Sequence, residues 1–339
     1  MPIATPEQYA EMLDKAKVGG FAYPAFNVSS SQTINAVLQG LTDAGSDGII
    51  QVTTGGADYF AGHSVKNRAS GALAFAAFVH EVAKNYPISV ALHTDHCAKD
   101  ALDGFVMPLL EASEAEVKAG RNPIFQSHMW DGSAIPMAAN LEIAKTLLPR
   151  MKAINAILEV EVGVVGGEED GVSHDVDEHL YTTLEDAISL VEALGLGEQG
   201  RYMAALTFGN VHGVYKPGGV QLRPELLGEI QAGLAAKYGT SAMPLDLVFH
   251  GGSGSSDLEI STAVAHGVVK MNIDTDTQYA FSRSIADTIF KNYDGFLKVD
   301  GEVGNKKIYD PRAWGKIAET AMAHRVAQAT QQLGSAGKH

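Results

Sequence analysis

The sequence has little cysteine and little positive charge, and each shortage excludes a class of protein. Cys97 is the only cysteine among 339 residues, which rules out an internal disulfide and fits a reducing cytoplasm. Lysine and arginine number 25 against 40 acidic residues, and no basic run is long enough to follow a phosphate backbone. With a net charge of −15, the chain is not expected to bind nucleic acid.

Long apolar runs and interdomain linkers are also missing. Residues 1–13 contain no apolar core of signal-peptide length, and no other stretch is long enough to span a bilayer, so no membrane partner is expected. No segment rich in proline, glycine or serine divides the chain, and 45% of its residues are hydrophobic, enough for a large core. We expect a cytoplasmic protein that folds as a single domain over residues 1–339.

What the sequence does contain is an alternation of short apolar runs with segments of helical period. The apolar runs are almost continuously hydrophobic, as in a parallel sheet that helices cover on its outer face. They are expected to form strands at residues 21–28, 47–53, 88–96, 123–129, 156–163, 202–209, 245–251 and 267–274.

Eight strand–helix repeats of this kind match the size of an α/β protein of the (β/α)8 TIM barrel class. A doubly wound open sheet is the competing architecture, but no G-x-G-x-x-G motif follows the first strand to support it. We therefore predict a barrel over about residues 20–295, with an appended C-terminal helical segment over about residues 296–339.

Polar side chains recur where the apolar runs end. In a TIM barrel the carboxyl ends of the strands form the active face, and polar groups are costly to bury. The third, sixth and seventh runs each lead to a histidine, and three neutral imidazoles that converge on one point make a good Zn²⁺ site. The predicted ligands are His96, His212 and His250, with Glu161 after the fifth run as a fourth or alternate ligand.

Two neighbours of these residues, His93 and Cys97, are not counted among the metal ligands. His93 lies on the same predicted strand as Asp95 and faces the same side, deeper in the barrel, so we interpret it as a structural histidine. Cys97 is interpreted as a buried apolar thiol rather than as a metal ligand.

Loops rich in glycine, serine and threonine follow the last two strands, where barrel enzymes usually bind phosphate. Residues 249–256 read FHGGSGSS and residues 272–277 read NIDTDT, so backbone N–H groups and hydroxyls could both face phosphate oxygens.

A loop at 164–175 is longer than a plain turn and contains two adjacent glycines. Such loops often close as lids, and this one could bring Glu168, Glu169 or Asp170 onto a substrate as a general base.

The sequence resembles the class II, metal-dependent fructose-bisphosphate aldolases over nearly its whole length. The matching stretches run from about residue 24 to about residue 314 and include PAFNVSSSQTINAVLQ, HTDHC, GGEEDGV, FGNVHGVYKPG, FHGGSGS, VVKMNIDTDTQYA and YDPRAW. The resemblance implies a lyase of glycolysis and gluconeogenesis, in which zinc stabilises an ene-diolate. Its reaction would be the reversible cleavage of fructose 1,6-bisphosphate to dihydroxyacetone phosphate and glyceraldehyde 3-phosphate. A tagatose-bisphosphate aldolase of the same metal-dependent class is the alternative.

The resemblance also implies the catalytic roles. Asp95 corresponds to the acid/base that acts on the C4 hydroxyl, and Glu169 to the lid base that takes a proton from dihydroxyacetone phosphate. Asn272 corresponds to a residue that helps to hold the ene-diolate. The implied metal ligands are again His96, His212 and His250, with Glu161 holding the metal when it moves to a second position.

Substrate-binding positions follow from the same resemblance. Arg312 corresponds to an arginine that meets one phosphate from a neighbouring subunit, which implies a homodimer or homotetramer. A monovalent cation, K⁺ or Na⁺, is expected beside the phosphate loops. The remaining substrate and phosphate positions are Asn27, Thr53, Gly213, Gly251, Ser253, Asp274 and Thr275.

Three other functions fit parts of the sequence. A metal-free Schiff-base aldolase would need a lysine at the barrel mouth, and Lys270 or Lys216 are candidates, but neither explains three strand-end histidines. A zinc hydrolase would give no role to the phosphate loops, and a non-enzymatic sugar-phosphate sensor would have no need of Asp95 or Glu169. Loss of substrate cleavage on treatment with a chelator would separate these functions.

Overall fold

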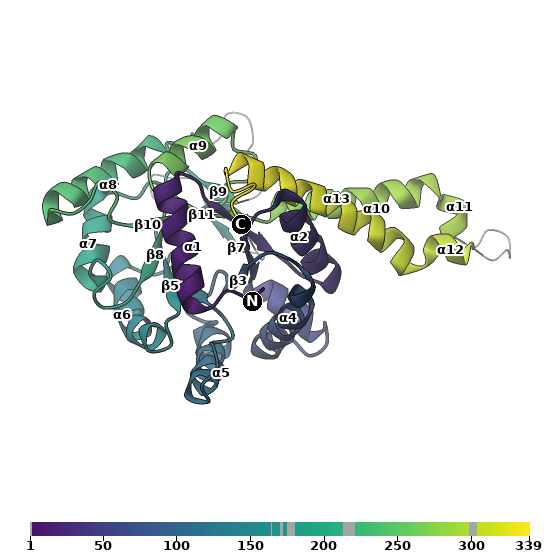
Figure 1. Cartoon of the computed structure of the whole chain (residues 1–339), viewed down its shortest axis with the longest axis horizontal. Helices are drawn as coiled ribbons and strands as arrows, with labels where there is room; N and C mark the ends of the chain where they lie inside the picture. Colours follow the sequence, from purple (N-terminus) through teal and green to yellow (C-terminus); the bar gives the residue numbers. More distant parts are fainter. Residues whose placement is uncertain (1, 164, 170–171, 175–179, 213–220, 298–303) are drawn as a thin grey trace.

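The structure is a computed structural model of the chain, and it describes residues 2–163, 165–169, 172–174, 180–212, 221–297 and 304–339. Figure 1 shows a central barrel of strands enclosed by helices, from which a pair of long helices extends to one side as an arm. None of the helices described combines the length and the hydrophobicity needed to cross a membrane.

The predicted TIM barrel is confirmed. Within the described residues, eight parallel strands close into a barrel in which each strand pairs with the next one along the chain. The strands are β1 (Tyr23–Asn27), β2 (Gly48–Val52), β3 (Val90–Thr94), β4 (Ser127–Trp130), β5 (Ile157–Val162), β8 (Tyr202–Leu206), β10 (Asp246–Phe249) and β11 (Val268–Ile273).

The strands overlap the apolar runs of the sequence, and only β4 is clearly displaced. It begins four residues later than predicted. Gln126, just before it, still bonds to both neighbouring strands: its backbone N–H donates to the carbonyl of Leu92 at 3.0 Å and its carbonyl accepts from the N–H of Ile157 at 2.9 Å. The regular pattern is interrupted there because the backbone N–H of Leu92 donates to the side-chain Oε1 of Gln126 at 2.8 Å. Apolar residues therefore lead into this strand without belonging to it.

Helices form the outer layer, as the alternation predicts. Several are preceded by a Ser or Thr whose hydroxyl accepts a hydrogen bond from the first turn, among them α2 (Ser31–Ala44), α7 (Leu184–Leu194) and α9 (Asp257–Ala265). Two short 3-10 turns, η1 (Ala83–Asn85) and η2 (Leu102–Gly104), accompany these helices. The helices of the layer are α2 (Ser31–Ala44), α3 (Thr54–Ala61), α4 (Arg68–Val82), α5 (Val106–Lys118), α6 (Met137–Ala153), α7 (Leu184–Leu194), α8 (Glu225–Tyr238) and α9 (Asp257–Ala265).

A helix that the sequence analysis did not identify crosses one end of the barrel. α1 (Pro6–Gly19) begins with a capping box at Thr5 and ends at Gly20, which has the left-handed φ of 63° that favours glycine. Figure 1 shows α1 lying across the barrel. Its buried face packs on inward-facing residues near the start of the strands. These contacts involve Tyr9, Met12, Leu13 and Ala16 of α1 and, from the strands, Tyr23, Ala25, Ile49, Ala91, Ile157, Met203, Val248 and Val269. The helix thus covers the end of the barrel opposite the predicted active face.

The C-terminal segment forms the arm and also joins the barrel. The arm begins before the predicted segment at 296–339, because α10 (Thr275–Lys291), which falls in the predicted barrel range, belongs to it (Figure 1). The other parts of the arm are α11 (Tyr293–Phe296), α12 (Lys306–Tyr309) and the first half of α13 (Pro311–Gln332). The second half of α13 packs on α2, where a Cβ added at Gly40 would lie only 2.5 Å from the carbonyl oxygen of Ala323. The appended helix is therefore part of the outer layer at its C-terminal end.

The predicted lid is a β-hairpin in the part that the structure describes. β6 (Gly166–Glu169) pairs antiparallel with β7 (Val172–His174), and on its other side it pairs parallel with β9 (Val211–His212). Glu168 and Glu169 lie on β6, where Glu169 pairs with Val172 of β7, and Asp170 lies outside the described residues. The hairpin is thus joined by backbone hydrogen bonds to the strand that contains His212.

Candidate active site

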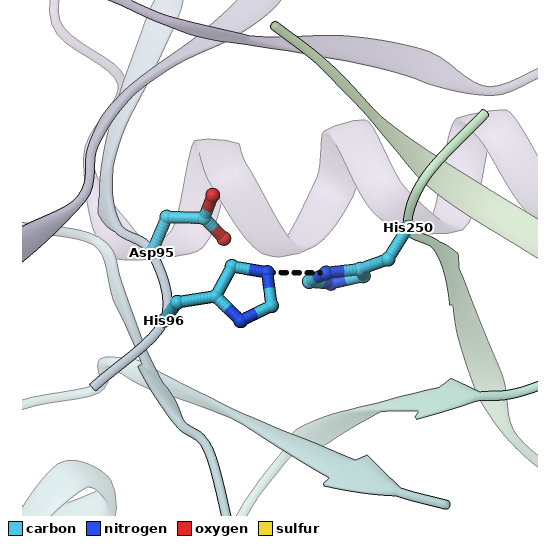
Figure 2. Close-up of side chains that lie close together, drawn as sticks. All are labelled: Asp95, His96 and His250. Carbon is cyan, nitrogen blue, oxygen red and sulfur yellow. Dashed lines mark hydrogen bonds between the residues drawn. The ribbon is translucent and has the colours of Figure 1, made fainter. Parts of the chain in front are cut away.

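The carboxyl ends of the barrel strands bring together several of the predicted site residues. Figure 2 shows Asp95 and His96, which follow β3, facing His250, which follows β10. Asp95 and His250 are completely buried, and Asn272 on the neighbouring β11 is 8% exposed. Polar side chains are therefore packed together at the one end of the barrel that α1 does not cover.

A strained backbone turns His96 toward this cluster. Side chains alternate between the two faces of a strand, so Asp95 and His96 would normally point in opposite directions. His96 instead has a φ of +40°, in the left-handed region that costs a residue other than glycine about 1–3 kcal/mol. The turn lets two adjacent residues both face the barrel mouth.

Two imidazole nitrogens face each other at the centre of the cluster. His250 Nδ1 lies 3.0 Å from His96 Nε2, as the dashed line in Figure 2 marks. Behind them, His250 Nε2 lies 2.7 Å from Glu159 Oε1 and His96 Nδ1 lies 3.0 Å from Asp131 Oδ2. A carboxylate that holds the outer nitrogen of a histidine leaves the lone pair of the inner nitrogen for a metal ion, as in known carboxylate–histidine–metal sites.

The arrangement fits a divalent metal ion. The possible ligand atoms of Asp95, His96 and His250 lie within 4.8 Å of one another, and those of His96, Asp131 and Glu161 form a second such group. Glu161 is almost fully buried, and its Oε2 lies 3.6 Å from His96 Nδ1. The predicted ligands His96, His250 and Glu161 are thus neighbours in the fold.

Burial and charge set the protonation of these groups. Burial lowers the pKa of His250, although the carboxylate of Glu159 opposes this effect, so the ring is neutral at neutral pH and able to bind metal. Burial alone would raise the pKa of Asp131, but hydrogen bonds from His96 and Ser133 hold it well below its usual range. Asp131 is therefore a carboxylate that accepts from His96.

Glu159 is also ionised, although it has no exposed surface. Burial alone would raise its pKa, but the Lys270 ammonium, with His93 and His250, holds it well below its usual range. His93 is completely buried and its own pKa is lowered, first by burial and then by Lys270. Its Nδ1 lies 2.8 Å from Ser127 Oγ and its Nε2 lies 4.0 Å from Asp95 Oδ1, below the site and within the barrel.

Three side-chain amides hold the carboxylate of Asp95. Asn27 Nδ2 and Gln51 Nε2 both donate to Oδ2 at 3.0 Å, and Asn272 Nδ2 donates to Oδ1 at 2.9 Å. The amides come from β1, β2 and β11, so three strands fix the direction of one side chain. Asn27 and Asn272 were predicted from the sequence, whereas Gln51 was not.

The glycine-rich loop after β10 approaches another strand closely. Gly251 has a φ of +61°, and a Cβ placed there would lie 2.8 Å from the backbone carbonyl of Val211. Ser253 in the same loop is 8% exposed. Asp274 and Thr275 stand at the N-terminus of α10, where helix N–H groups favour an anion. The predicted phosphate positions that the structure describes thus lie on two adjacent loops.

A cavity of about 180 Å³ lies beside this loop, between the barrel and α13. Asp276 in the first turn of α10 and Arg325 of α13 form an ion pair at its wall, with 2.7 Å between Oδ2 and Nη2. The pair ties the start of α10 to the outer helix layer.

Thr53 has a structural contact in addition to its predicted contact with substrate. Its hydroxyl accepts a hydrogen bond from the backbone N–H of Gly56 at 3.0 Å and so caps α3, a helix that the sequence analysis did not identify. Cys97 is buried, as interpreted, and burial raises the pKa of its thiol to about 12.

The other predicted residues lie outside the described part of the chain or away from this cluster. The backbones of His212 and Glu169 lie in β9 and β6, but their side chains and the whole of Gly213 are outside the described residues. Arg312 lies in the arm, with a side chain 85% exposed and paired with Asp310 at 2.7 Å. The arm points away from the barrel in Figure 1, so Arg312 does not join the cluster around Asp95.

Four residues that hold the cluster together were not predicted to do so from the sequence: Gln51, Asp131, Glu159 and Lys270, the last considered only as an alternative Schiff-base lysine. Two of them had a signal in the sequence, because inward-facing residues of a strand are two apart. Glu159 precedes Glu161 by two residues on β5, and Lys270 precedes Asn272 by two on β11, so each pair shares the barrel interior.

Comparisons with known proteins agree with this geometry. A family model described as "Fructose-bisphosphate aldolase class-II" matches residues 7–338. A fructose-bisphosphate aldolase of Streptomyces coelicolor is 64% identical over 340 residues, with 100% of this chain and 99% of that protein covered. The fructose-bisphosphate aldolase of Corynebacterium glutamicum is 59% identical with the same coverage. Among solved structures, the fructose-bisphosphate aldolase from Campylobacter jejuni superposes with a TM-score of 0.87 at 38% identity, covering 99% of this chain and 97% of that one.

Proposed function

Since this chain belongs to the class II fructose-bisphosphate aldolase family, we propose that it cleaves fructose 1,6-bisphosphate with a zinc ion held at the mouth of its barrel. The reaction is reversible and gives dihydroxyacetone phosphate and glyceraldehyde 3-phosphate. The observation that supports the metal site most directly is the pair of nitrogens on His96 and His250, which face each other while carboxylates hold their outer nitrogens.

The proposed zinc ligands are His96, His212 and His250, with Glu161 available for a second position. Neutral imidazole is a ligand that zinc prefers, and the buried His250 is neutral. When bound, the zinc ion supplies a Lewis acid that polarises the ketone of the substrate and stabilises the negative charge of the departing fragment.

Asp95 is the proposed acid/base. In cleavage its carboxylate takes the proton of the C4 hydroxyl while the C3–C4 bond breaks, and in condensation it returns that proton to the new hydroxyl. The amides of Asn27, Gln51 and Asn272 keep the carboxylate in one orientation for this transfer. Asn272 Nδ2 carries a second hydrogen, which can be donated to an oxygen of the charged fragment.

Glu169 is the proposed base for the other proton. In condensation it takes a proton from the carbon of dihydroxyacetone phosphate that forms the new bond, and in cleavage it returns that proton. Its strand β6 pairs with β9, the strand of His212, so backbone hydrogen bonds connect the hairpin of Glu169 to a proposed zinc ligand.

The two phosphate groups are proposed to bind at different places. One meets the loops after β10 and β11, beside a monovalent cation, K⁺ or Na⁺, and the other meets Arg312 of a neighbouring subunit in a homodimer or homotetramer. The arm that contains Arg312 exposes large apolar side chains, which a second subunit could cover: Tyr279, Phe290 and Tyr293 are 61%, 79% and 56% exposed. The proposed residues of the first phosphate and of the substrate chain are Asn27, Thr53, Gly213, Gly251, Ser253, Asp274 and Thr275.

We place the reaction in glycolysis and gluconeogenesis, in the cytoplasm. Tagatose 1,6-bisphosphate is the alternative substrate and differs from the fructose sugar in stereochemistry at one carbon. The curated relatives are named fructose-bisphosphate aldolases, which favours fructose.

Removal and return of the metal test this function. Treatment with EDTA should abolish cleavage of fructose 1,6-bisphosphate, and added Zn²⁺ should restore it, with metal content and the rates on both sugars measured on the same sample. Borohydride should fail to trap substrate on the protein, because no lysine forms a Schiff base. Undiminished cleavage by the metal-free protein, or trapping at Lys270, would overturn the proposal.

A further inference from the structure

Lys270 is a buried ammonium group to which the reaction described above gives no role. It lies on β11 with no exposed surface, and its Nζ donates to Glu159 Oε2 at 2.8 Å and to Asn272 Oδ1 at 2.7 Å. Burying a charge costs several kcal/mol unless partners compensate it, and an apolar residue often replaces a buried ion pair without loss of stability. The charge therefore needs an explanation other than stability of the barrel.

The contacts of Lys270 link the metal site to the acid/base. On one side Glu159 connects it to His250, whose Nε2 lies 2.7 Å from Glu159 Oε1. On the other side Asn272 connects it to Asp95, because Asn272 Nδ2 donates to Asp95 Oδ1 at 2.9 Å. Lys270 stands in the middle of one continuous chain of hydrogen bonds.

The ammonium group can only donate hydrogen bonds, and this decides how the amide of Asn272 is turned. The amide must present Oδ1 to Nζ, so that Nδ2 faces Asp95 and the space for substrate. Both orientations of an asparagine amide occupy the same volume, and its terminal torsion is soft. Asp95, which can only accept, favours the same orientation from the other side, so without a donor at position 270 one of the two contacts that fix the direction of the amide is lost.

We propose that Lys270 is a positioning residue that fixes the direction of the Asn272 amide, so that an N–H group rather than an oxygen faces the reacting atoms. This inference rests on the roles proposed above for Asp95 and Asn272. The competing explanation is that Lys270 only neutralises the buried Glu159. The two explanations differ once the charge of Glu159 has been removed.

The first experiment therefore compares two residues at position 270 in a Glu159→Gln background. With Lys270→Met or Lys270→Gln, both proteins lack the buried charge pair, but only Gln can donate to Asn272 Oδ1. Zinc content and unfolding temperature are expected to be the same in the two variants. The kcat of the Met variant should be about 10²–10³-fold lower than that of the wild type, because one hydrogen-bond donor to the transition state is lost. The Gln variant should recover part of that loss. Wild-type turnover in the Met variant would overturn the proposal.

The second experiment asks whether Lys270 acts through Asn272. Asn272→Ala is made in the wild type and in the Glu159→Gln, Lys270→Met background, and kcat is measured for all four proteins. If the amide is already misdirected, the added substitution should cost less than about twofold there, whereas independent effects would multiply. Met271→Leu is the matched control. Met271 stands between Lys270 and Asn272 in the sequence, but its side chain packs in the outer hydrophobic layer, so this variant should keep wild-type turnover.

The outcomes separate this inference from the proposed function. Multiplied losses would show that Lys270 does not act through the amide and would overturn the inference alone. Unchanged turnover in Asn272→Ala itself would overturn the role proposed for Asn272, and the inference with it.

Discussion

The lower half of the barrel interior, next to α1, is filled by apolar side chains, whereas the upper half holds charged and polar ones. In the lower half Leu13 packs among strand residues such as Ile157 and Met203. In the upper half Glu159 contacts His250 and Lys270. The residues named in both halves are at most 2% exposed, so exclusion of water alone does not explain the difference in composition.

Strand β5 shows the change within a few residues. Its inward positions are Ile157, Glu159 and Glu161, spaced two apart, and each is at most 2% exposed. Burying Ile157 is favourable by about 1.5–3 kcal/mol, while burying a carboxylate is costly unless partners compensate it. The lower half of the strand therefore stabilises the fold, and the upper half uses part of that stability to hold groups for chemistry.

The largest expected effect is on turnover, from Asp95→Ala in the upper half. We expect kcat to fall by roughly 10²–10⁴-fold, because the proton of the C4 hydroxyl loses its acceptor. Zinc content should change little, since the histidines remain in place, whereas the free energy of unfolding should change because three buried amides lose their acceptor. Cleavage rate, metal content and urea denaturation measured on one preparation test this expectation.

Two results would contradict it. Full turnover in Asp95→Ala would remove this residue from the mechanism. Loss of zinc would instead mean that Asp95 is a metal ligand, as its position in one group with His96 and His250 would allow.

The next effect is on stability, from Leu13→Ala in the lower half. Leu13 has no exposed surface, so we expect the free energy of unfolding to fall by about 2–5 kcal/mol through lost burial and a residual cavity. At temperatures where the variant is folded, kcat should be that of the wild type. Denaturant unfolding and initial rates measure the two quantities.

Val18→Ala is the matched control on the same helix. Val18 is 91% exposed, and its truncation should change stability by no more than about 0.5 kcal/mol. A lower kcat in folded Leu13→Ala would show that the two halves of the interior are not independent.

The sequence predicted the barrel because its strands are near-continuous apolar runs that alternate with helices. It also predicted much of the upper half, since His96, His250 and Asn272 stand where such runs end. It did not predict α1, although the segment carries a helical signal: its buried residues Tyr9, Met12, Leu13 and Ala16 have helical spacing, and Thr5 forms a capping box with Gln8. What the segment alone does not show is that this face packs on strand residues as distant as Met203.

The supporting carboxylates were hidden for a similar reason. Residue types show that Asp131 and Glu159 lie near strand ends, but not which imidazole nitrogen each one contacts. The left-handed backbone of His96 is another feature of this kind, since nothing in HTDH distinguishes a residue that turns inward from one that continues the strand. The role of the acid/base, and the choice of Glu169 among the three acidic residues of the lid, came from the family resemblance rather than from spacing.

The smallest expected effect is on metal affinity, from Asp131→Ala at the edge of the upper half. Asp131 Oδ2 accepts from His96 Nδ1 at 3.0 Å, and losing such a partner typically weakens metal binding by about 10–100-fold. At saturating zinc, kcat should be close to wild type, because Asp131 contacts a ligand and not the substrate. Asp131→Asn keeps an oxygen acceptor for the imidazole N–H and should lose less affinity in a zinc competition assay. Equal losses of zinc affinity in both variants would mean that the site needs the negative charge of Asp131 and not the oriented hydrogen bond to His96. The upper half would then stabilise the metal ion through its electric field rather than through oriented contacts.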